Sequence, residues 1–266
     1  MRSEYLFQKL EEGKGLKAQG YRGRYAPTTS GPLHFGNIRT ALISWLQARL
    51  NKGTWLLRVD DLDTARNKQG ALESIEYDLT WLGLKWDGPT LLQSKRRGLY
   101  RLAISHLRNQ NKIYPCVCSR KSLAIATSNQ KNKIYPGRCR NLNLSYGFHQ
   151  EQLPSLRLKV NKVYENKCGD VIIRRSDGYI AYHLASVIDE LTLGINEVVR
   201  GVDLLDALYP QLAIIDSLQQ DQLIYQHAPI LLDKKGNKLS KRNNINGLEV
   251  FRSNGMRPPK VIGLMA

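Results

Sequence analysis

Residues 24–37 read RYAPTTSGPLHFGN and divide into a strand, a turn and the start of a helix. The lead-in 21–25 is strand-like, Pro27 and the small residues after it indicate a turn, and apolar residues recur at helical spacing from Ile38 to Leu46. A strand that enters a helix through such a turn presents backbone N–H groups and the positive end of the helix dipole to an anion. The stretch therefore predicts a phosphate site.

Three residues at the start of the predicted helix are candidates for contact with a nucleotide. His34 falls in the first turn, where its imidazole can donate a hydrogen bond to a phosphoryl oxygen. Gly36 lacks the Cβ that would keep a nucleotide from lying against the backbone, and Asn37 follows it. Small-residue turns before helices are common, so an ordinary capped helix is the alternative interpretation.

A second motif near the far end of the chain favours the nucleotide interpretation. Residues 238–242 read KLSKR, a doubly cationic loop that contains Lys238, Ser240 and Lys241. Such a loop can close over a triphosphate and stabilise the charge that develops on it during transfer. Lysine-rich loops are ordinarily just solvated, and the argument therefore depends on the two motifs together.

An acidic cluster follows a second predicted strand. Residues 54–59 (TWLLRV) are typical of a buried parallel strand, and the cluster Asp60, Asp61 and Asp63 comes directly after it. In doubly wound folds ligands gather at the carboxyl ends of the strands. We therefore expect these carboxylates to lie where a substrate binds.

The cysteines predict either a metal site or a set of reduced thiols. Cys116 and Cys118 form a C-x-C pair, Cys139 follows, and Cys168 stands apart. One short turn can place two thiolates of a C-x-C pair on one ion. Disulfides are not expected, because the sequence gives no sign of secretion. The conventional candidates for a further ligand are His106 and His149.

The composition favours a polyanionic partner. The 266 residues contain 40 Lys and Arg against 23 Asp and Glu, which gives a net charge of +17. This balance favours nucleic acid, with an acidic membrane surface as the alternative. Residues 94–109 form a basic predicted helix, which contacts either RNA or water. No apolar run is long enough to cross a membrane, and residues 1–20 lack a secretory core, so a cytoplasmic protein is expected.

Both motifs resemble those of the class I aminoacyl-tRNA synthetases. The stretch 24–37 resembles their HIGH signature, and KLSKR resembles their KMSKS loop. The surrounding sequence is most similar to the glutamate branch, in which RxAPSPSGxLHxG is followed by R-[IV]-E-D-[IL]-D; residues 58–63 read RVDDLD here. The resemblance covers residues 21–245 and implies an α/β fold, a Rossmann-type doubly wound parallel sheet with an inserted zinc-binding subdomain.

The expected organisation has five parts. They are an N-terminal tail (1–20), the first half of a nucleotide-binding core (21–109), an inserted subdomain with a zinc site (110–180), the second half of the core with the KLSKR loop (181–245), and a C-terminal tail (246–266).

The chain ends soon after KLSKR, which leaves no room for the anticodon-binding part of an ordinary glutamyl-tRNA synthetase. The resemblance therefore points to the truncated paralogues of that enzyme. It implies tRNA-independent activation of glutamate with ATP to glutamyl-adenylate, and transfer of glutamate to queuosine in the anticodon loop of tRNA(Asp). The implied ligands are ATP as substrate, Mg²⁺ and Zn²⁺. The expected partners are glutamate, ATP and the anticodon stem-loop of tRNA(Asp), with no membrane, and the chain is expected to be a monomer.

The resemblance also assigns site residues. It implies His34 and Lys241 as catalytic residues, and His34, Gly36, Asn37, Lys238, Ser240 and Lys241 as ATP-binding residues. The glutamate-binding residues would be Arg24, Tyr25, Ala26, Pro27, Thr28, Asp60, Tyr182 and Arg200. The zinc ligands would be Cys116, Cys118, Tyr135 and Cys139, the last two matching a Y-x3-C pattern.

Two residues depart from the family pattern. Asp60 stands where the family usually has Glu, which shortens the reach to the α-ammonium group by one methylene. Thr29 stands where the family often has Pro. Three other functions stay open: an inactive RNA-binding relic, favoured if Asp60 abolishes activation; a truncated synthetase that charges the tRNA 3′ end; and a class I nucleotidyltransferase for another small acid.

Overall fold

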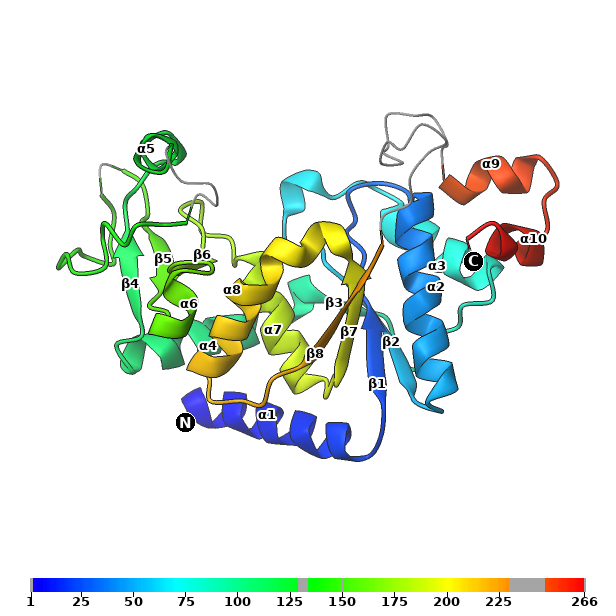
Figure 1. Ribbon diagram of the computed structural model, residues 1–266, viewed down its shortest axis with the longest axis horizontal. Helices are drawn as coiled ribbons and strands as arrows, with labels where there is room; N and C mark the ends of the chain where they lie inside the picture. Colours follow the sequence, from blue (N-terminus) through cyan, green and yellow to red (C-terminus); the bar gives the residue numbers. More distant parts are fainter. Residues whose placement is uncertain (1, 129–133, 150, 230–246, 266) are drawn as a thin grey trace. The chain divides into compact units, whose positions relative to one another are not determined.

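The computed structural model describes residues 2–128, 134–149, 151–229 and 247–265, which form two compact units. The parallel-sheet unit consists of Gly15–Lys95, Gly194–Leu205 and Leu223–Ala266. The antiparallel-sheet unit consists of Met1–Lys14, Arg96–Leu193 and Asp206–Gln222. Figure 1 labels the elements of both, and each unit is described by itself.

The parallel-sheet unit is built on five strands. They are β1 (Arg22–Tyr25), β2 (Thr54–Val59), β3 (Leu91–Leu92), β7 (Glu197–Gly201) and β8 (Ile224–Ala228). β1 pairs with β2, β2 with β3, and β7 with β8, all in parallel. β7 also lies beside β1, because the Asn196 N–H donates to the Arg22 carbonyl at 3.1 Å. The spatial order β3-β2-β1-β7-β8 is that of a doubly wound sheet, so the prediction of an α/β fold with a parallel sheet is confirmed.

Helices and short 3₁₀ turns complete this unit. The helices are α2 (Phe35–Leu50), α3 (Ala71–Trp81), α9 (Gly247–Ser253) and α10 (Pro258–Gly263), and the turns are η1 (Thr64–Arg66), η2 (Gln93–Arg96, its last residue in the other unit) and η3 (Val202–Ala207, which ends in the other unit). Apolar side chains of β2 and α2 form a core with those of α3; Trp55, Leu57 and Ile38 are fully buried in it. The expected strand 54–59 is therefore confirmed, with both faces covered, as a parallel strand requires.

The C-terminal segment that was expected to be a tail packs on this core. Leu248 and Val261 are fully buried in the same cluster as Trp55, and Met265 is nearly so. Arg252 of α9 donates to the Asp78 carboxylate of α3 at 2.6 Å. α9 and α10 are too short, and hold too few apolar residues, for a helical repeat to be recognised in the sequence. Their apolar side chains become buried only by packing on the core that α2 and α3 help to form.

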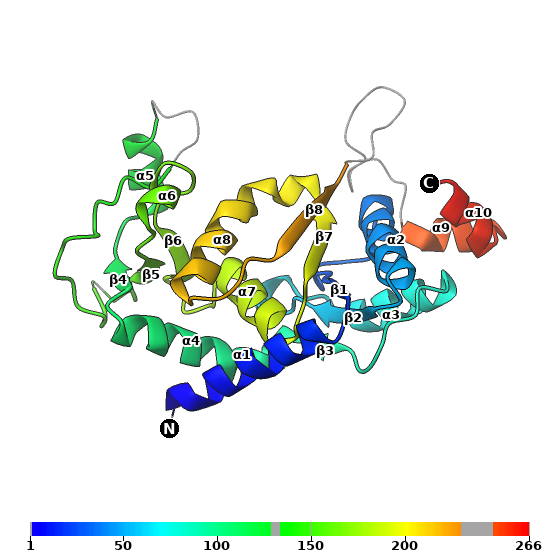
Figure 2. The ribbon, with the colours of Figure 1, turned by 60° about the horizontal axis from the view of Figure 1, so that its bottom comes forward.

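The antiparallel-sheet unit contains β4 (Ile113–Cys116), β5 (Ser155–Leu158) and β6 (Val171–Arg174), which pair in that order. Its helices are α4 (Arg97–Asn109), α5 (Arg120–Ala126), α6 (Lys162–Glu165), α7 (Tyr182–Thr192) and α8 (Leu208–Ser217). Figure 2 shows the three strands beside one another. The unit begins and ends differently from the expected insertion 110–180, because α4 and α7 pack together.

A buried carboxylate joins α4 and α7. Asp189 is fully buried, accepts a hydrogen bond from the Tyr100 hydroxyl at 2.9 Å and pairs with Arg96 at 2.6 Å. Arg108 covers the Tyr146 ring, with its guanidinium carbon 3.9 Å from the ring centroid. Two cations of the predicted basic helix, Arg96 and Arg108, therefore have structural partners within the unit.

The N-terminal segment that was expected to be a tail forms α1 (Arg2–Ala18). Leu6 and Leu10 are buried, and Phe7 makes an edge contact with His106. A Cβ at Gly13 would lie 1.9 Å from the Leu191 carbonyl oxygen, so only glycine permits this approach to α7. Most residues of this segment are polar, and only one narrow side of the helix is apolar, so the sequence by itself resembles a tail.

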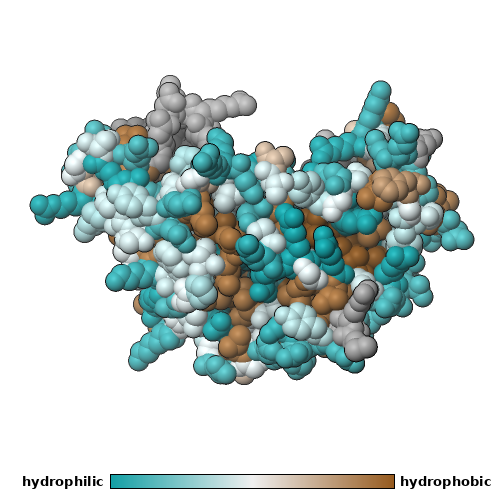
Figure 3. All heavy atoms as spheres, turned by 180° about the vertical axis from the view of Figure 1, so that it is seen from behind, coloured by the Kyte–Doolittle hydropathy of each residue, from teal (hydrophilic) through white to brown (hydrophobic). Residues whose placement is uncertain are grey.

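No helix among the described residues is long and apolar enough to cross a membrane. Hydrophilic residues cover much of the face shown in Figure 3, with apolar ones scattered between them.

Candidate functional site

The predicted phosphate loop and the acidic cluster lie side by side in the parallel-sheet unit. Thr28 and Asp60 form a bridge beyond the paired ends of β1 and β2, and the Asp60 N–H donates to the Pro27 carbonyl at 2.8 Å. Ala26, Pro27 and Thr28 thus continue β1 past its carboxyl end. This is the edge of a doubly wound sheet at which ligands bind.

His34 caps the helix that follows the loop. Its Nδ1 accepts a hydrogen bond from the Asn37 N–H at 3.3 Å, and the Asn37 side chain accepts one from the His34 N–H at 3.3 Å. Because Nδ1 is an acceptor, the neutral imidazole carries its proton on Nε2. A Cβ at Gly36 would lie 3.3 Å from the imidazole, tight enough to disturb the ring. His34 is therefore the N-cap of the helix, as the alternative interpretation has it, and its contact with phosphate stays a prediction.

Two buried arginines lie on neighbouring strands of the same sheet. Arg24 on β1 donates from Nη1 to the Val199 carbonyl on β7 at 3.0 Å. Arg200 on β7 donates from Nε to Nε2 of His227 on β8 at 3.1 Å. Burial, and then the charge of Arg200, lower the pKa of His227, which keeps the imidazole neutral and able to accept. Each arginine is 3% exposed, and such cations are suited to bidentate pairing with a carboxylate.

Asp60 has a partner that the sequence interpretation missed. Arg58, fully buried on β2, pairs with Asp60 through both oxygens, Nε to Oδ1 at 2.8 Å and Nη2 to Oδ2 at 3.2 Å. Alternating strand residues point to the same face, so the R-x-D spacing could have indicated the pair. The carboxylate expected to receive an α-ammonium group is thus already held by a guanidinium.

Thr29, the second departure from the family pattern, also gains a contact. Its hydroxyl hydrogen-bonds to the Asn67 side chain, and its carbonyl accepts from the Lys68 N–H at 2.9 Å. Asn67 in turn donates to the Asp61 carbonyl at 2.9 Å. A proline could not supply this hydroxyl, so Thr29 ties the phosphate loop to the segment after β2.

Other predicted residues lie elsewhere. Tyr25 is buried and stacks on Trp55 with ring centroids 6.2 Å apart, so only its backbone faces the loop region; burial raises its pKa. Tyr182 is the first residue of α7 in the other unit, where its ring makes an edge contact with His183. Lys238, Ser240 and Lys241 of the KLSKR motif lie outside the described residues.

In the antiparallel-sheet unit, the four residues proposed as metal ligands come together. The Tyr135 hydroxyl lies 3.4 Å from the Cys116 sulfur and 3.9 Å from the Cys118 sulfur. The Cys118 and Cys139 sulfurs are 3.5 Å apart, and the three sulfurs all lie within 4.8 Å of one another. Among the described residues no histidine joins this group: His106 packs on Phe7, and His149 contacts the Ser145 carbonyl.

The group has the dimensions of a tetrahedral metal site. Ligands around a tetrahedral Zn²⁺ lie about 3.8 Å apart for two sulfurs and about 3.5 Å apart for a sulfur and an oxygen. Burial opposes ionisation of Cys116, but hydrogen bonds from Tyr135, the Cys118 backbone and Arg157 lower its pKa to about 7. Burial and the neighbouring Cys139 and Cys116 raise the pKa of Cys118 to about 11. Three thiols and a phenol so close together fit the donor set of a metal centre.

Comparison with known proteins identifies the family of the chain. Residues 21–262 match the family model of the class I tRNA synthetases (E and Q), catalytic domain. A glutamyl-Q tRNA(Asp) synthetase of Prochlorococcus marinus strain MIT 9313 is 55% identical over 99% of this chain and 86% of its own length. The chain belongs to the glutamyl-Q tRNA(Asp) synthetases. Other members of this family include one from Parasynechococcus marenigrum, 50% identical over 99% of this chain and 88% of its own length.

The chain is also similar to part of a larger protein of known structure. A glutamate tRNA ligase from Elizabethkingia meningosepticum, crystallised in complex with its amino acid, has a TM-score of 0.71 and 26% identity. The match covers 84% of this chain and 52% of that one, so the chain spans about half the length of the ligase.

Proposed function

We propose that this chain activates glutamate with ATP and transfers it to queuosine in the anticodon stem-loop of tRNA(Asp), acting as a monomer. The observation that carries the proposal is the sheet edge in a chain 55% identical to a glutamyl-Q tRNA(Asp) synthetase. There a helix capped by His34 follows β1, and two buried arginines, Arg24 and Arg200, lie on β1 and the neighbouring β7.

In the first step the α-carboxylate of glutamate attacks the α-phosphorus of ATP. A new P–O bond joins the carboxylate to the α-phosphorus. The bond between the α-phosphorus and the oxygen that bridges it to the β-phosphate breaks, and its electron pair leaves with pyrophosphate. His34 donates from Nε2 to a phosphate oxygen, and the N-terminal end of α2 at Gly36 adds the positive end of the helix dipole. Lys241, assisted by Lys238 and Ser240, neutralises the triphosphate, and Mg²⁺, if it comes with ATP, would add further positive charge there.

Glutamate itself is held by charge complementarity. Arg24 and Arg200 pair with its side-chain carboxylate, and Tyr182 supplies a hydroxyl. The backbone at the carboxyl end of β1 and just past it lines the glutamate site at the edge of the sheet. It belongs to Tyr25, Ala26, Pro27 and Thr28. Asp60 receives the α-ammonium group while it keeps its pair with Arg58.

In the second step an acceptor group on the RNA attacks the acyl carbonyl of glutamyl-adenylate. The new bond to the acceptor forms, the acyl–phosphate bond breaks, and AMP leaves with the electron pair. The protein's part is to align the two reactants and to exclude water from the adenylate.

We also propose that Cys116, Cys118, Tyr135 and Cys139 hold one Zn²⁺. The support is the ligand spacing and the donor set described above. Bound there, the ion would cross-link the loops that follow β4 and α5, in the manner of a structural centre.

The decisive experiment is ATP–pyrophosphate exchange with glutamate, without RNA and with tRNA(Asp), followed by mapping of labelled glutamate on the RNA. We expect ATP–pyrophosphate exchange in the absence of RNA, and we expect the labelled glutamate on the fragment of tRNA(Asp) that contains the anticodon. Label at the 3′ end would instead identify a truncated charging enzyme, and exchange with another small acid in place of glutamate would identify a different nucleotidyltransferase.

The Asp60–Arg58 pair favours a second candidate, an RNA-binding relic, because it occupies the carboxylate that the amino acid needs. Tight tRNA binding with no exchange in the wild type, and exchange restored in Asp60→Glu, would establish that candidate and contradict the proposed activity.

A further inference from the structure

Arg157 on β5 contacts two of the four proposed metal ligands at once. Its Nε donates to the Cys116 sulfur at 3.3 Å, and its guanidinium carbon lies 3.7 Å from the centroid of the Tyr135 ring. Its Nη1 donates to the Asp170 backbone carbonyl at 2.7 Å. The arginine is 5% exposed, so these contacts replace most of its hydration.

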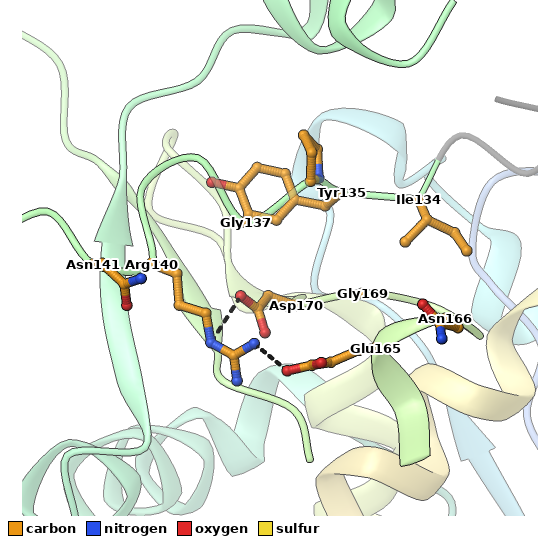
Figure 4. Close-up of a pocket in the computed structure, with 10 residues that line it drawn as sticks. Ile134, Tyr135, Gly137, Arg140, Asn141, Glu165, Asn166, Gly169 and Asp170 are labelled. Carbon is orange, nitrogen blue, oxygen red and sulfur yellow. Dashed lines mark hydrogen bonds and ion pairs between the residues drawn. The ribbon is translucent and has the colours of Figure 1, made fainter. Parts of the chain in front are cut away.

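None of these contacts of Arg157 is an ion pair with a carboxylate. The nearby Asp170 carboxylate is taken by other groups: it accepts from the Tyr114 hydroxyl at 2.6 Å and from the Val160 N–H at 3.0 Å. Asp170 pairs instead with Arg140, whose Nε lies 3.7 Å from Oδ2, and Figure 4 marks this ion pair with a dashed line. A buried cation without a carboxylate is costly unless another negative group lies beside it.

The metal centre would supply that negative charge. Three thiolates and one phenolate around Zn²⁺ carry a formal charge of about −2, and one guanidinium beside them halves it. The guanidinium also lies against the Tyr135 ring, so it restricts the ring plane and with it the direction of the hydroxyl. Phenol is an unusual metal ligand, with an ordinary pKa near 10, and needs such support to compete with water.

The backbone behind Tyr135 is fixed as well. Gly169 has φ +63°, and a Cβ there would lie 2.9 Å from both the Ile134 Cγ2 and the Tyr135 carbonyl oxygen. Tyr135 is therefore held by Gly169 at its backbone and by Arg157 at its ring. Figure 4 shows Tyr135, Ile134 and Gly169 together at the wall of a cavity of about 650 Å³.

We infer that Arg157 is the positioning residue that holds the Tyr135 phenol in the metal centre and balances the charge of the centre. The inference rests on the proposed Zn²⁺ site. It separates the four ligands into two classes: the cysteines bind the ion with or without Arg157, whereas Tyr135 binds it only with Arg157 in place.

The test compares the full-length wild type with Arg157→Lys, Arg157→Gln, Tyr135→Phe and the double variant Arg157→Lys/Tyr135→Phe. Zinc per chain is measured first, and then the rate of zinc release to excess chelator. Lysine keeps the charge but cannot stack as a planar fork, so Arg157→Lys should release zinc about tenfold faster, as should Tyr135→Phe. The double variant should be no faster than Tyr135→Phe, because both changes remove the same interaction.

Cobalt substitution supplies a readout that a general packing role would not move. The thiolate-to-cobalt absorption should persist in Arg157→Lys, while the visible ligand-field bands shift to those of Tyr135→Phe. The matched control is Arg174→Lys, an arginine on the adjacent strand β6 that donates to the Pro154 carbonyl; it should match the wild type in both assays.

Several outcomes would overturn the inference. If the effects of the two changes on the zinc release rate multiply in the double variant, Arg157 acts on the thiolates and not through Tyr135. If neither Arg157 variant changes the zinc release rate, Arg157 does not position Tyr135. Failure of both Arg157 variants to fold, with Tyr135→Phe folded, would assign Arg157 to packing. Less than one zinc ion per chain in the wild type would instead contradict the proposed zinc site itself.

Discussion

The edge of the parallel sheet and the cysteine cluster of the antiparallel sheet are built in different ways. At the sheet edge, most candidate residues lie within a few positions of a strand end, and pairing of β1 with β2 places Thr28 beside Asp60. In the cluster, the ligands come from the end of β4 and from a loop about Tyr135, and Arg157 on β5 completes the group. A site of the first kind follows from the order of the strands, whereas one of the second kind needs a cross-link or packing to bring its loops together.

The largest expected effect tests whether the two sites are independent. Cys139→Ala should lose nearly all bound zinc and loosen the loop around Tyr135, because three ligands without the fourth leave the site open. Amide hydrogen exchange should rise in that loop, while ATP–pyrophosphate exchange without RNA stays within about threefold of the wild type.

The control for that variant is Cys168→Ala, a cysteine outside the cluster whose thiol donates a hydrogen bond to the Tyr164 carbonyl. It should keep full zinc content. A collapse of pyrophosphate exchange in Cys139→Ala would show that the two regions depend on one another.

The next effect concerns the sheet edge alone. Arg200→Gln should lower kcat/KM for glutamate in pyrophosphate exchange by about 100-fold, because a buried arginine that pairs with a carboxylate is worth a few kcal/mol. The loss should appear mainly as a raised KM for glutamate, with the KM for ATP little changed. Arg22→Gln, on the same sheet but outside the proposed site, is the control, and equal losses in both variants would argue against a glutamate contact.

A smaller effect separates the buried ion pair from an exposed one in the same segment. Asp60→Asn should lower the free energy of unfolding in urea by about 2 kcal/mol, because it removes the negative charge that the buried Arg58 contacts through both carboxylate oxygens. Asp63→Asn is the matched control: Asp63 pairs with the exposed Arg66 at 3.3 Å, and such pairs contribute about 0–1 kcal/mol. Equal losses would contradict the structural role of the Arg58 pair.

The smallest effect is a pH dependence at the sheet edge. The pKa of His227 is lowered from 6.5 by burial and by Arg200, so the unfolded chain binds a proton more readily than the folded one. Stability is therefore lost as pH falls through about 6.5. His227→Gln should flatten unfolding free energy against pH in that range, whereas His149→Gln should not; an unchanged slope in His227→Gln would place the acid sensitivity elsewhere.

The long segments with a clear period were predictable from the sequence. The strand 54–59 and the helix after His34 follow from an unbroken apolar run and from a 3.6-residue repeat. The terminal helices α1 and α10 were not predictable from the sequence. Each buries only a narrow row of apolar side chains, and such a row is recognised as part of a core only when the surface that it packs on is known. The division into units was also missed, because the Tyr100–Asp189 contact joins helices on either side of the expected insertion.

By itself, the sequence determined the strand–turn–helix at residues 24–37 and the strand that leads into Asp60. Those features depend on neighbours in the chain, where backbone geometry and side-chain period act directly. Only the tertiary structure decided that Arg24 reaches the Val199 carbonyl, that Arg58 holds Asp60, and that Arg157 lies on Tyr135. Buried charges take their partners from whatever the packed fold places beside them, and no local pattern records that choice.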